Sequence, residues 1–301
     1  MTLVGLTALR PLLGEIGDAK RIRVAASSGS LAEQAFSRAW ARLVAAEDPE
    51  QVALSETAAA VARARLAGID ADVLRTAGLS AGQSHEVLQR AFDEMGDVLD
   101  AALRDRLRHR LRDALPLPGP AAPVPELAAL LNRQPRAGAT CPGTPRIIVE
   151  PAESHGDHCL TVAVYGVLLS PLVGSDPVTP FLIGLAHHLH NVRLPDAGFA
   201  GEALLGTHLP DVLATLEQRE LAALPCPLAE RLREVLLLRA DAVAPASQAF
   251  HAADVLDRVL QVHHHARAAA FTAAQALDDL ELVHAGPVQA FHLEVLAGAQ
   301  L

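Results

Sequence analysis

The chain has 301 residues and a formal net charge of −10; half of its residues are hydrophobic and 3% are aromatic. This length allows one large domain or two modest ones, and the hydrophobic content is sufficient for a sizeable core. The acidic balance, with no basic run of note, argues against nucleic acid as a partner, because phosphate binding needs clustered Lys and Arg. The Ala- and Leu-rich, aromatic-poor composition favours an all-α fold.

The cysteines and the apolar segments indicate where the protein resides. Cys141, Cys159 and Cys226 are scattered, which indicates a reducing compartment rather than a disulfide framework. No stretch reaches about eighteen uninterrupted apolar residues, the length needed to span a membrane. Residues 1–17 lack a basic region followed by a long apolar core. We therefore expect a cytoplasmic protein with no membrane partner and no targeting peptide.

Residues 1–114 form the first predicted part, a smaller helical N-terminal region. Ser30 and Glu33 form a capping-box motif ahead of an apolar stripe that includes Trp40. Ser84 is the expected cap of a later helix. Five arginines between residues 104 and 112 are interpreted as a solvated face. The expected helices lie at 31–43, 51–67, near 71–74, 84–95 and 97–113.

Residues 115–145 are rich in Pro and Gly and form the predicted linker. The stretch from Leu115 to Pro125 cannot continue a helix, because proline lacks the backbone N–H and clashes with the preceding turn. A short helix is expected at 126–132. Residues 146–150 read as one short extended segment, for which the sequence offers no partner strand.

Residues 146–301 form the second predicted part, which consists of several antiparallel helices. Pro180 is tolerable there because it falls in the first turn of its helix. The three-histidine run at 263–265 points in three directions on a helix and is interpreted as surface. The expected helices lie at 157–169, 178–190, 202–205, 209–224, 227–241, 247–271 and 287–296.

The candidate chemistry lies in His158, the His187-His188 pair and Asp254, which occupy three separate apolar helices. Neutral imidazoles and a carboxylate from different helices can converge on one transition metal. A carboxylate in the middle of an apolar helix also needs a partner or a metal, since burying a lone charge is costly. On a continuous helix His187 and His188 point about 100° apart, so one faces the site and the other packs or binds a carbonyl.

These residues lie in segments that resemble the HD-domain superfamily of metal-dependent phosphohydrolases. The family motif is an apolar helix that ends in His-Asp, and the segment from Leu185 to Asp196 is similar to it. His158 opens a helix as the first family histidine does, and Ala253 to Arg258 resembles the final family helix. The chain departs from the pattern where His188, His190 and Asn191 replace the family's Asp, Gly and Lys. The resemblance covers about residues 150–285.

The resemblance implies an HD-like helical bundle that holds one or two divalent transition metal ions (Fe, Mn, Ni or Zn). His158, His187 and Asp254 would be ligands, with His188 as a neutral fourth, and His208 resembles the downstream histidine of two-metal members. His190 and Arg193 would contact substrate oxygens. Asp196 follows in the same Leu-Pro-Asp register as in the cyclic-dinucleotide phosphodiesterase branch. Either Asp196 or Glu202 is a carboxylate that could compensate for the lost family Asp if the loop folds inward.

Three functions remain open at this point. The first is an HD-type hydrolase that acts on a phosphoester or another small anionic molecule. The second is an HD-type iron oxygenase that acts on a small molecule, which histidine-rich ligation would suit. The third is a catalytically inactive HD-like sensor or scaffold, which the altered signature favours. The N-terminal region is a candidate lid or dimerisation element, so a homodimer is a candidate assembly.

Overall fold

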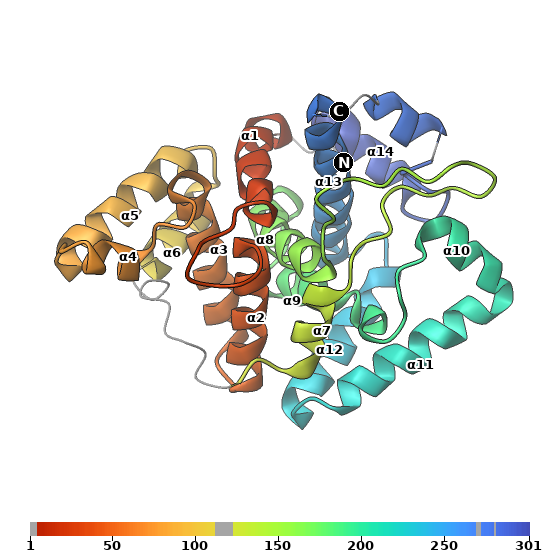
Figure 1. The fold of residues 1–301 in the computed structure, drawn as a ribbon, viewed down its shortest axis with the longest axis horizontal. Helices are drawn as coiled ribbons and strands as arrows, with labels where there is room; N and C mark the ends of the chain where they lie inside the picture. The colour runs from red at the N-terminus through yellow and green to blue at the C-terminus, as the bar shows by residue number, and fades with distance from the viewer. Residues whose placement is uncertain (1–4, 112–122, 269–271, 280) are drawn as a thin grey trace.

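A computed structural model describes residues 5–111, 123–268, 272–279 and 281–301. Within these ranges the protein has fourteen α-helices and no strand, only isolated bridges, so the all-α prediction is confirmed (Figure 1). The extended segment expected at 146–150 contributes one such bridge, between Ile147 and Ala139. The proline-rich stretch predicted at 115–125 falls largely at 112–122, outside the described residues.

Helix α8 (His155–Val173) is the central element of the fold. It packs against α9 (Val178–Ala186) and α13 (Pro245–Ala268), and also against α2 (Leu31–Val44) and α3 (Pro49–Leu66). By length and composition α8 could cross a membrane, but 83% of its most apolar window is buried inside the protein. Its apolar residues therefore serve as the core of this bundle.

One cluster of buried apolar side chains joins the two predicted parts of the chain. It includes Leu13 and Trp40 from the first part, and Leu168 and Val255 from the second. Residues 1–114 and 146–301 therefore share a hydrophobic core. Helix α1 (Leu6–Gly17), which the sequence analysis did not predict, contributes to it by packing against α13 and α14 (Gln289–Gly298), and the chain's first and last helices lie side by side (Figure 1).

The helix starts follow from local capping chemistry. The Ser30 capping box is confirmed: the Glu33 backbone N–H donates to Ser30 Oγ at 2.9 Å, and the Ser30 N–H donates to the Glu33 carboxylate at 2.7 Å. The prediction that Ser84 is a cap is wrong. Helix α5 (Ala81–Gly96) begins one turn earlier, because Ser80 and Gln83 form the reciprocal box there and Ser84 is buried inside the helix.

The remaining helices lie close to their predicted positions and surround the central ones. In Figure 1, α4 to α6 lie at one end of the molecule, and α10 and α11 lie at the other. Their bounds are α4 Ala71–Thr76, α6 Ala101–Arg110, α7 Glu126–Arg133, α10 Gly198–Leu205, α11 Leu209–Ala222 and α12 Cys226–Leu237.

We expect Gly184→Ala to destabilise the fold, because α8 and α9 approach closely at this residue. A Cβ at Gly184 would lie 2.5 Å from the Cα and 2.6 Å from the backbone N of Ala163. Backbone atoms cannot move aside without separating the helices, so the free energy of unfolding should fall by about 1–3 kcal/mol. Gly14→Ala in α1 is the control, because a Cβ there meets nothing within 4 Å. Urea unfolding that shows equal stability for the two variants would contradict the prediction.

Candidate metal centre

His158 is the centre of a buried cluster of ionisable side chains. It lies in the first turn of α8, behind the capping box of Ser154 and Asp157, and is fully buried. Its Nδ1 is 2.7 Å from Asp257 Oδ2. Its Nε2 is 3.1 Å from His187 Nε2 and 3.4 Å from Asp254 Oδ1. His158 therefore contacts both His187 and Asp254, whereas the three side chains whose ligand atoms all lie within 4.8 Å of one another are those of His158, His187 and His188.

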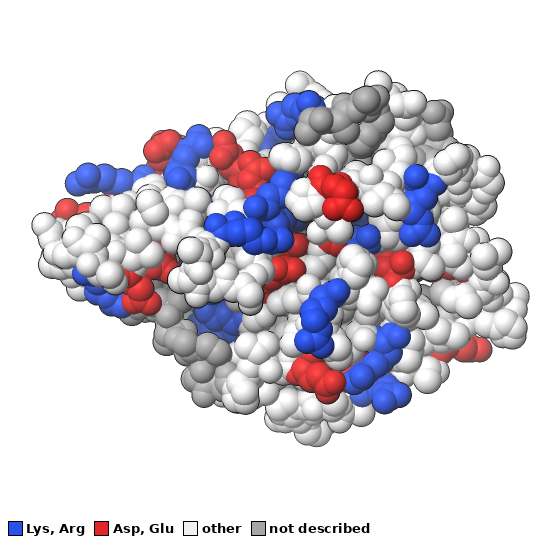
Figure 2. All heavy atoms as spheres, in the orientation of Figure 1, with Lys and Arg blue, Asp and Glu red and all other residues white. Residues whose placement is uncertain are grey.

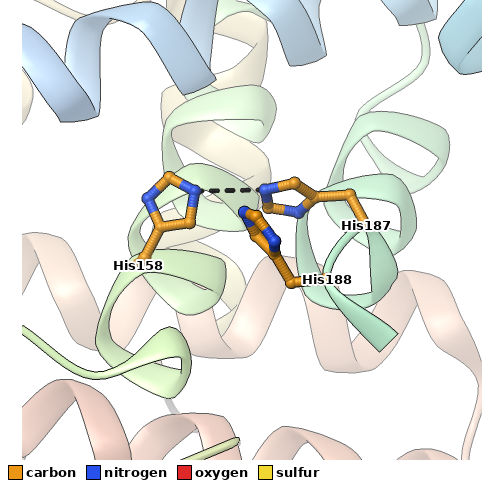
Figure 3. A group of neighbouring side chains, drawn as sticks. All are labelled: His158, His187 and His188. Carbon is orange, nitrogen blue, oxygen red and sulfur yellow. Dashed lines mark hydrogen bonds between the residues drawn. The ribbon is translucent and has the colours of Figure 1, made fainter. Parts of the chain in front are cut away.

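The His187-His188 pair does not lie on a continuous helix, contrary to the prediction for 178–190. Helix α9 ends at Ala186, His187 is its C-cap, and a separate 3-10 turn covers Leu189–Val192. The backbone of His188 has φ −109° and ψ 23°, outside the α-helical region. Both rings therefore face His158, each with its centroid 5.1 Å from the His158 ring (Figure 3).

The outer hydrogen bonds of His158 and His187 define where their protons lie. His187 Nδ1 is 2.7 Å from the Gly184 carbonyl oxygen, which can only accept, so Nδ1 carries the proton. His158 Nδ1 likewise donates to the Asp257 carboxylate. The two Nε2 atoms face each other across 3.1 Å. This distance fits either one N–H···N hydrogen bond or a metal ion bound by both nitrogens.

The charge states of these groups suit a transition metal. Burial lowers the pKa of His187 well below its ordinary value, and His158 lowers it further. Burial alone would raise the pKa of Asp254, but Arg258 and His158 outweigh it, so this pKa lies well below its ordinary value. Neutral imidazoles beside an ionised carboxylate are the donors that Fe, Mn, Ni or Zn take. Ligand nitrogens of His158, His187 and His188 lie within 4.8 Å of one another.

His188 differs from the other two histidines because its lone pair already has a partner. Its Nδ1–H donates to Asn191 Oδ1 at 2.8 Å, and Asn191 is oriented by donating to the Leu194 carbonyl at 3.0 Å. His188 Nε2 consequently accepts from the Arg136 guanidinium at 2.8 Å. His188 would have to displace Arg136 to become a ligand.

A second group of candidate ligands already contains a cation from the protein. Oxygen and nitrogen atoms of Glu153, His158 and Asp257 lie within 4.8 Å of one another. Lys20 Nζ donates to Glu153 Oε1 at 2.7 Å and also to Asp257. Asp257 therefore pairs with Lys20 and His158. Arg258 instead pairs with Asp254 at 3.1 Å.

The other predicted site residues are less central. His190 is half-buried, with its ring centroid 5.5 Å from that of His188, and burial with nearby Arg239 lowers its pKa to about 4. Arg193 pairs with Glu220 at 3.0 Å. Asp196 accepts from the backbone N–H groups of Ala137 and Gly198, which fixes its loop.

Two histidine predictions do not match the structure. His208 is exposed in the turn Gly206–His208 and belongs to neither ligand group of the described residues, so it does not support a second metal. The reason is tertiary, because this turn joins α10 to α11 at the edge of the molecule (Figure 1). His265, predicted to lie on the surface, is buried and binds Gln261 at 2.9 Å.

A pocket of about 260 Å³ lies beside the cluster and exposes part of it. Arg136 and Arg258 contribute positive charge to its wall, and Phe199 stacks on His284 with ring centroids 4.1 Å apart. Of the residues predicted to act in catalysis, Asp196 lines this pocket, whereas His190 and Arg193 are not among its lining residues. The lining includes Arg136, Glu153, His188, Asn191, Asp196, Phe199, Glu202, Arg258 and His284.

Sequence reasoning missed Arg136, which lies in the predicted linker, and His155. Burial opposes the charge of Arg136, but Glu153, Asp196 and Asp254 outweigh it and raise its pKa. His155 is fully buried, its ring centroid is 4.7 Å from that of His188, and neither of its ring nitrogens has a hydrogen-bond partner among the described residues. Its position directly after the capping Ser154 was the available signal, because it placed His155 one turn from His158.

Comparisons with known proteins do not place the chain in a family: no family model, curated protein or solved structure matches it. The arrangement of the residues described above therefore carries the functional argument.

Proposed function

We propose that the protein binds one divalent transition metal ion through His158, His187 and Asp254 and hydrolyses a small organic phosphoester. The observation that carries this proposal is the buried contact of His158 Nε2 with His187 Nε2 at 3.1 Å and with Asp254 Oδ1 at 3.4 Å. Metal–nitrogen bonds of about 2.0–2.1 Å allow both nitrogens to bind the same ion. The resemblance of residues 150–285 to HD-domain phosphohydrolases supports the same reaction class.

The pocket wall supplies groups for a phosphoester. The bound ion would polarise the phosphoryl group and make its coordinated water more acidic. The guanidinium groups of Arg136 and Arg258 line the same pocket and can bind phosphate oxygens with paired N–H donors. His188 holds Arg136 at that place by accepting one of its hydrogen bonds. The Phe199–His284 stack offers a flat wall for the organic part of the substrate.

The charge distribution favours one ion and a small ligand. Lys20 already neutralises the second candidate group, and the exposed His208 lies outside both groups. The surface in Figure 2 carries Lys and Arg interspersed with Asp and Glu, without the basic stripe that a nucleic acid would require. The pocket borders the histidine cluster through His188, and Arg136 and Arg258 bring positive charge to its wall.

Elemental analysis and a phosphatase assay test this proposal. We expect the purified protein to hold about one equivalent of Mn, Ni or Zn and to hydrolyse an aryl phosphate only when the ion is present. His158→Ala should lose both properties, since it removes the nitrogen that contacts both other ligands. Iron together with oxygen consumption would replace the proposal by an oxygenase. If the protein holds no metal after growth in metal-supplemented medium, the catalytically inactive sensor or scaffold would be the remaining hypothesis.

A further inference from the structure

Lys20 is a fully buried lysine whose ammonium lies beside the candidate metal centre. It follows α1 in the short turn Asp18–Lys20, and its side chain is 2% exposed. Lysine is almost never buried to this extent unless it is paired. Burial alone would lower the pKa of Lys20, but Asp257 and Glu153 outweigh it and raise this pKa, so the ammonium stays charged.

The partners of Lys20 connect it to the central histidine. Asp257 receives a hydrogen bond from Lys20 through Oδ1 and from His158 Nδ1 through Oδ2. Glu153 binds Lys20 at 2.7 Å and lies 3.9 Å from His158 Nδ1. Lys20, Asp257 and His158 are therefore linked in series, as a chain of two hydrogen bonds. The far end of that chain is His158 Nε2, which faces His187.

We propose that Lys20 is a positioning residue for the metal centre and the permanent cation of the Glu153–Asp257 pair. This inference rests on the proposed function. The ammonium holds Asp257 in place as an acceptor, Asp257 keeps the proton of His158 on Nδ1, and His158 Nε2 remains free to bind the ion. Partners of this kind, one step away from the metal, orient ligand histidines and raise their basicity.

Loss of Lys20 would disturb the centre through electrostatics. Glu153 and Asp257 would become two buried carboxylates that share one small space without a counter-charge. Asp257 would then turn away or take up a proton, and His158 would lose the contact that defines its tautomer. The N-terminal region, which carries no ligand or catalytic motif of its own, acquires a role in this way: it supplies Lys20 to a site whose other residues come from 136 onward.

A cobalt titration tests the proposal, because Co²⁺ bound by histidines is measured by its visible absorption. We expect Lys20→Met to weaken Co²⁺ binding by about 10–100-fold. Asp257→Asn breaks the same chain at its second link and leaves Lys20 paired with Glu153, so one positive and one negative charge remain. Asp257→Asn should therefore fold even if Lys20→Met fails to fold. It should show a loss of Co²⁺ affinity similar to that expected for Lys20→Met.

A second buried ion pair, whose hydrogen bonds among the described residues do not include a candidate ligand, supplies matched controls. Arg38 of α2 binds Glu56 of α3 through two contacts of 3.1 and 2.6 Å, with side chains 10% and 1% exposed. Arg38→Met and Glu56→Gln should lower the melting temperature but leave the Co²⁺ dissociation constant unchanged. A purely structural role of Lys20 would produce that same pattern.

The outcomes separate this inference from the proposed function. If the unaltered protein binds no Co²⁺, the proposed function fails and the inference fails with it. If the unaltered protein, folded Lys20→Met and Asp257→Asn all bind Co²⁺ equally well, the positioning role of Lys20 is overturned while the metal centre stands. Weaker binding by Asp257→Asn, with the Glu56→Gln control unchanged, supports the chain from Lys20 to His158.

Discussion

Asp254→Asn is expected to weaken metal binding by about 100-fold or more, because removing a direct ligand should cost at least as much as removing a partner one step from the metal, which costs about 10–100-fold. The substitution preserves the shape of the side chain but replaces an ionised carboxylate, 3.4 Å from His158 Nε2, by a neutral amide. It also removes the counter-charge of Arg258, which lies 3.1 Å from the other oxygen. The unpaired guanidinium would then repel the incoming cation, so the effects of both losses act in the same direction.

Equilibrium dialysis against Mn²⁺ or Zn²⁺ measures this loss, with circular dichroism to establish that the variant is folded. The matched control is Asp211→Asn, which changes an exposed aspartate in the first turn of α11. Unchanged metal content in the Asp254 variant would mean that this carboxylate serves only as the partner of Arg258. The assignment of Asp254 as a ligand would then have to be abandoned.

The metal-free protein is expected to lose a substantial part of its stability between about pH 6.5 and pH 5. Burial is the main cause that lowers the pKa of His155, and the charge of Arg136 is the second. Burial also lowers the pKa values of His187 and His188, and neighbouring histidines add to the effect. Histidine in the unfolded chain has a pKa of about 6.5. Above that pH these histidines are neutral in both the folded and the unfolded protein, so they contribute nothing to the pH dependence of stability. Below it the unfolded chain takes up protons that the folded protein cannot, so stability falls as the pH falls.

The expected size of this effect is a substantial fraction of the total stability of a domain. Each buried neutral histidine costs about 1.4 kcal/mol for every pH unit below its unfolded pKa. Three of them give a loss of about 6 kcal/mol at about pH 5. Burial raises the pKa of Asp157 to about 7, so its protonation in the folded protein restores about 2 kcal/mol over the same range. The net loss is about 4 kcal/mol, against a usual stability of about 5–15 kcal/mol. Urea unfolding in chelator at several pH values measures the loss. His155→Gln should make the curve shallower and His208→Gln should not, whereas a flat curve for the unaltered protein would contradict the prediction.

Local sequence determined the helices and the order of the candidate ligands. The Ser30–Glu33 box is a contact between residues three apart, and such contacts can be read from a sequence because they close within one helical turn. His158 and Asp254 were identifiable because each interrupts an apolar helix, where an ionisable group needs a partner. The same local reasoning failed at Ser84, where two overlapping signals competed and the better box, at Ser80, begins the helix.

Tertiary structure alone decided which groups meet. Lys20 and Asp257 are 237 positions apart, and Arg136 reaches His188 from a segment that composition marks only as a linker. Nothing periodic in the chain encodes these pairs, since they depend on how α1 and residues 134–154 pack against the bundle. The early end of α9 at Ala186 turned His188 toward His158, and the position of the α10–α11 turn left His208 exposed. The sequence by itself determined which side chains are able to bind a metal; packing decided which of them face a common point, because that depends on distances between elements that no local pattern records.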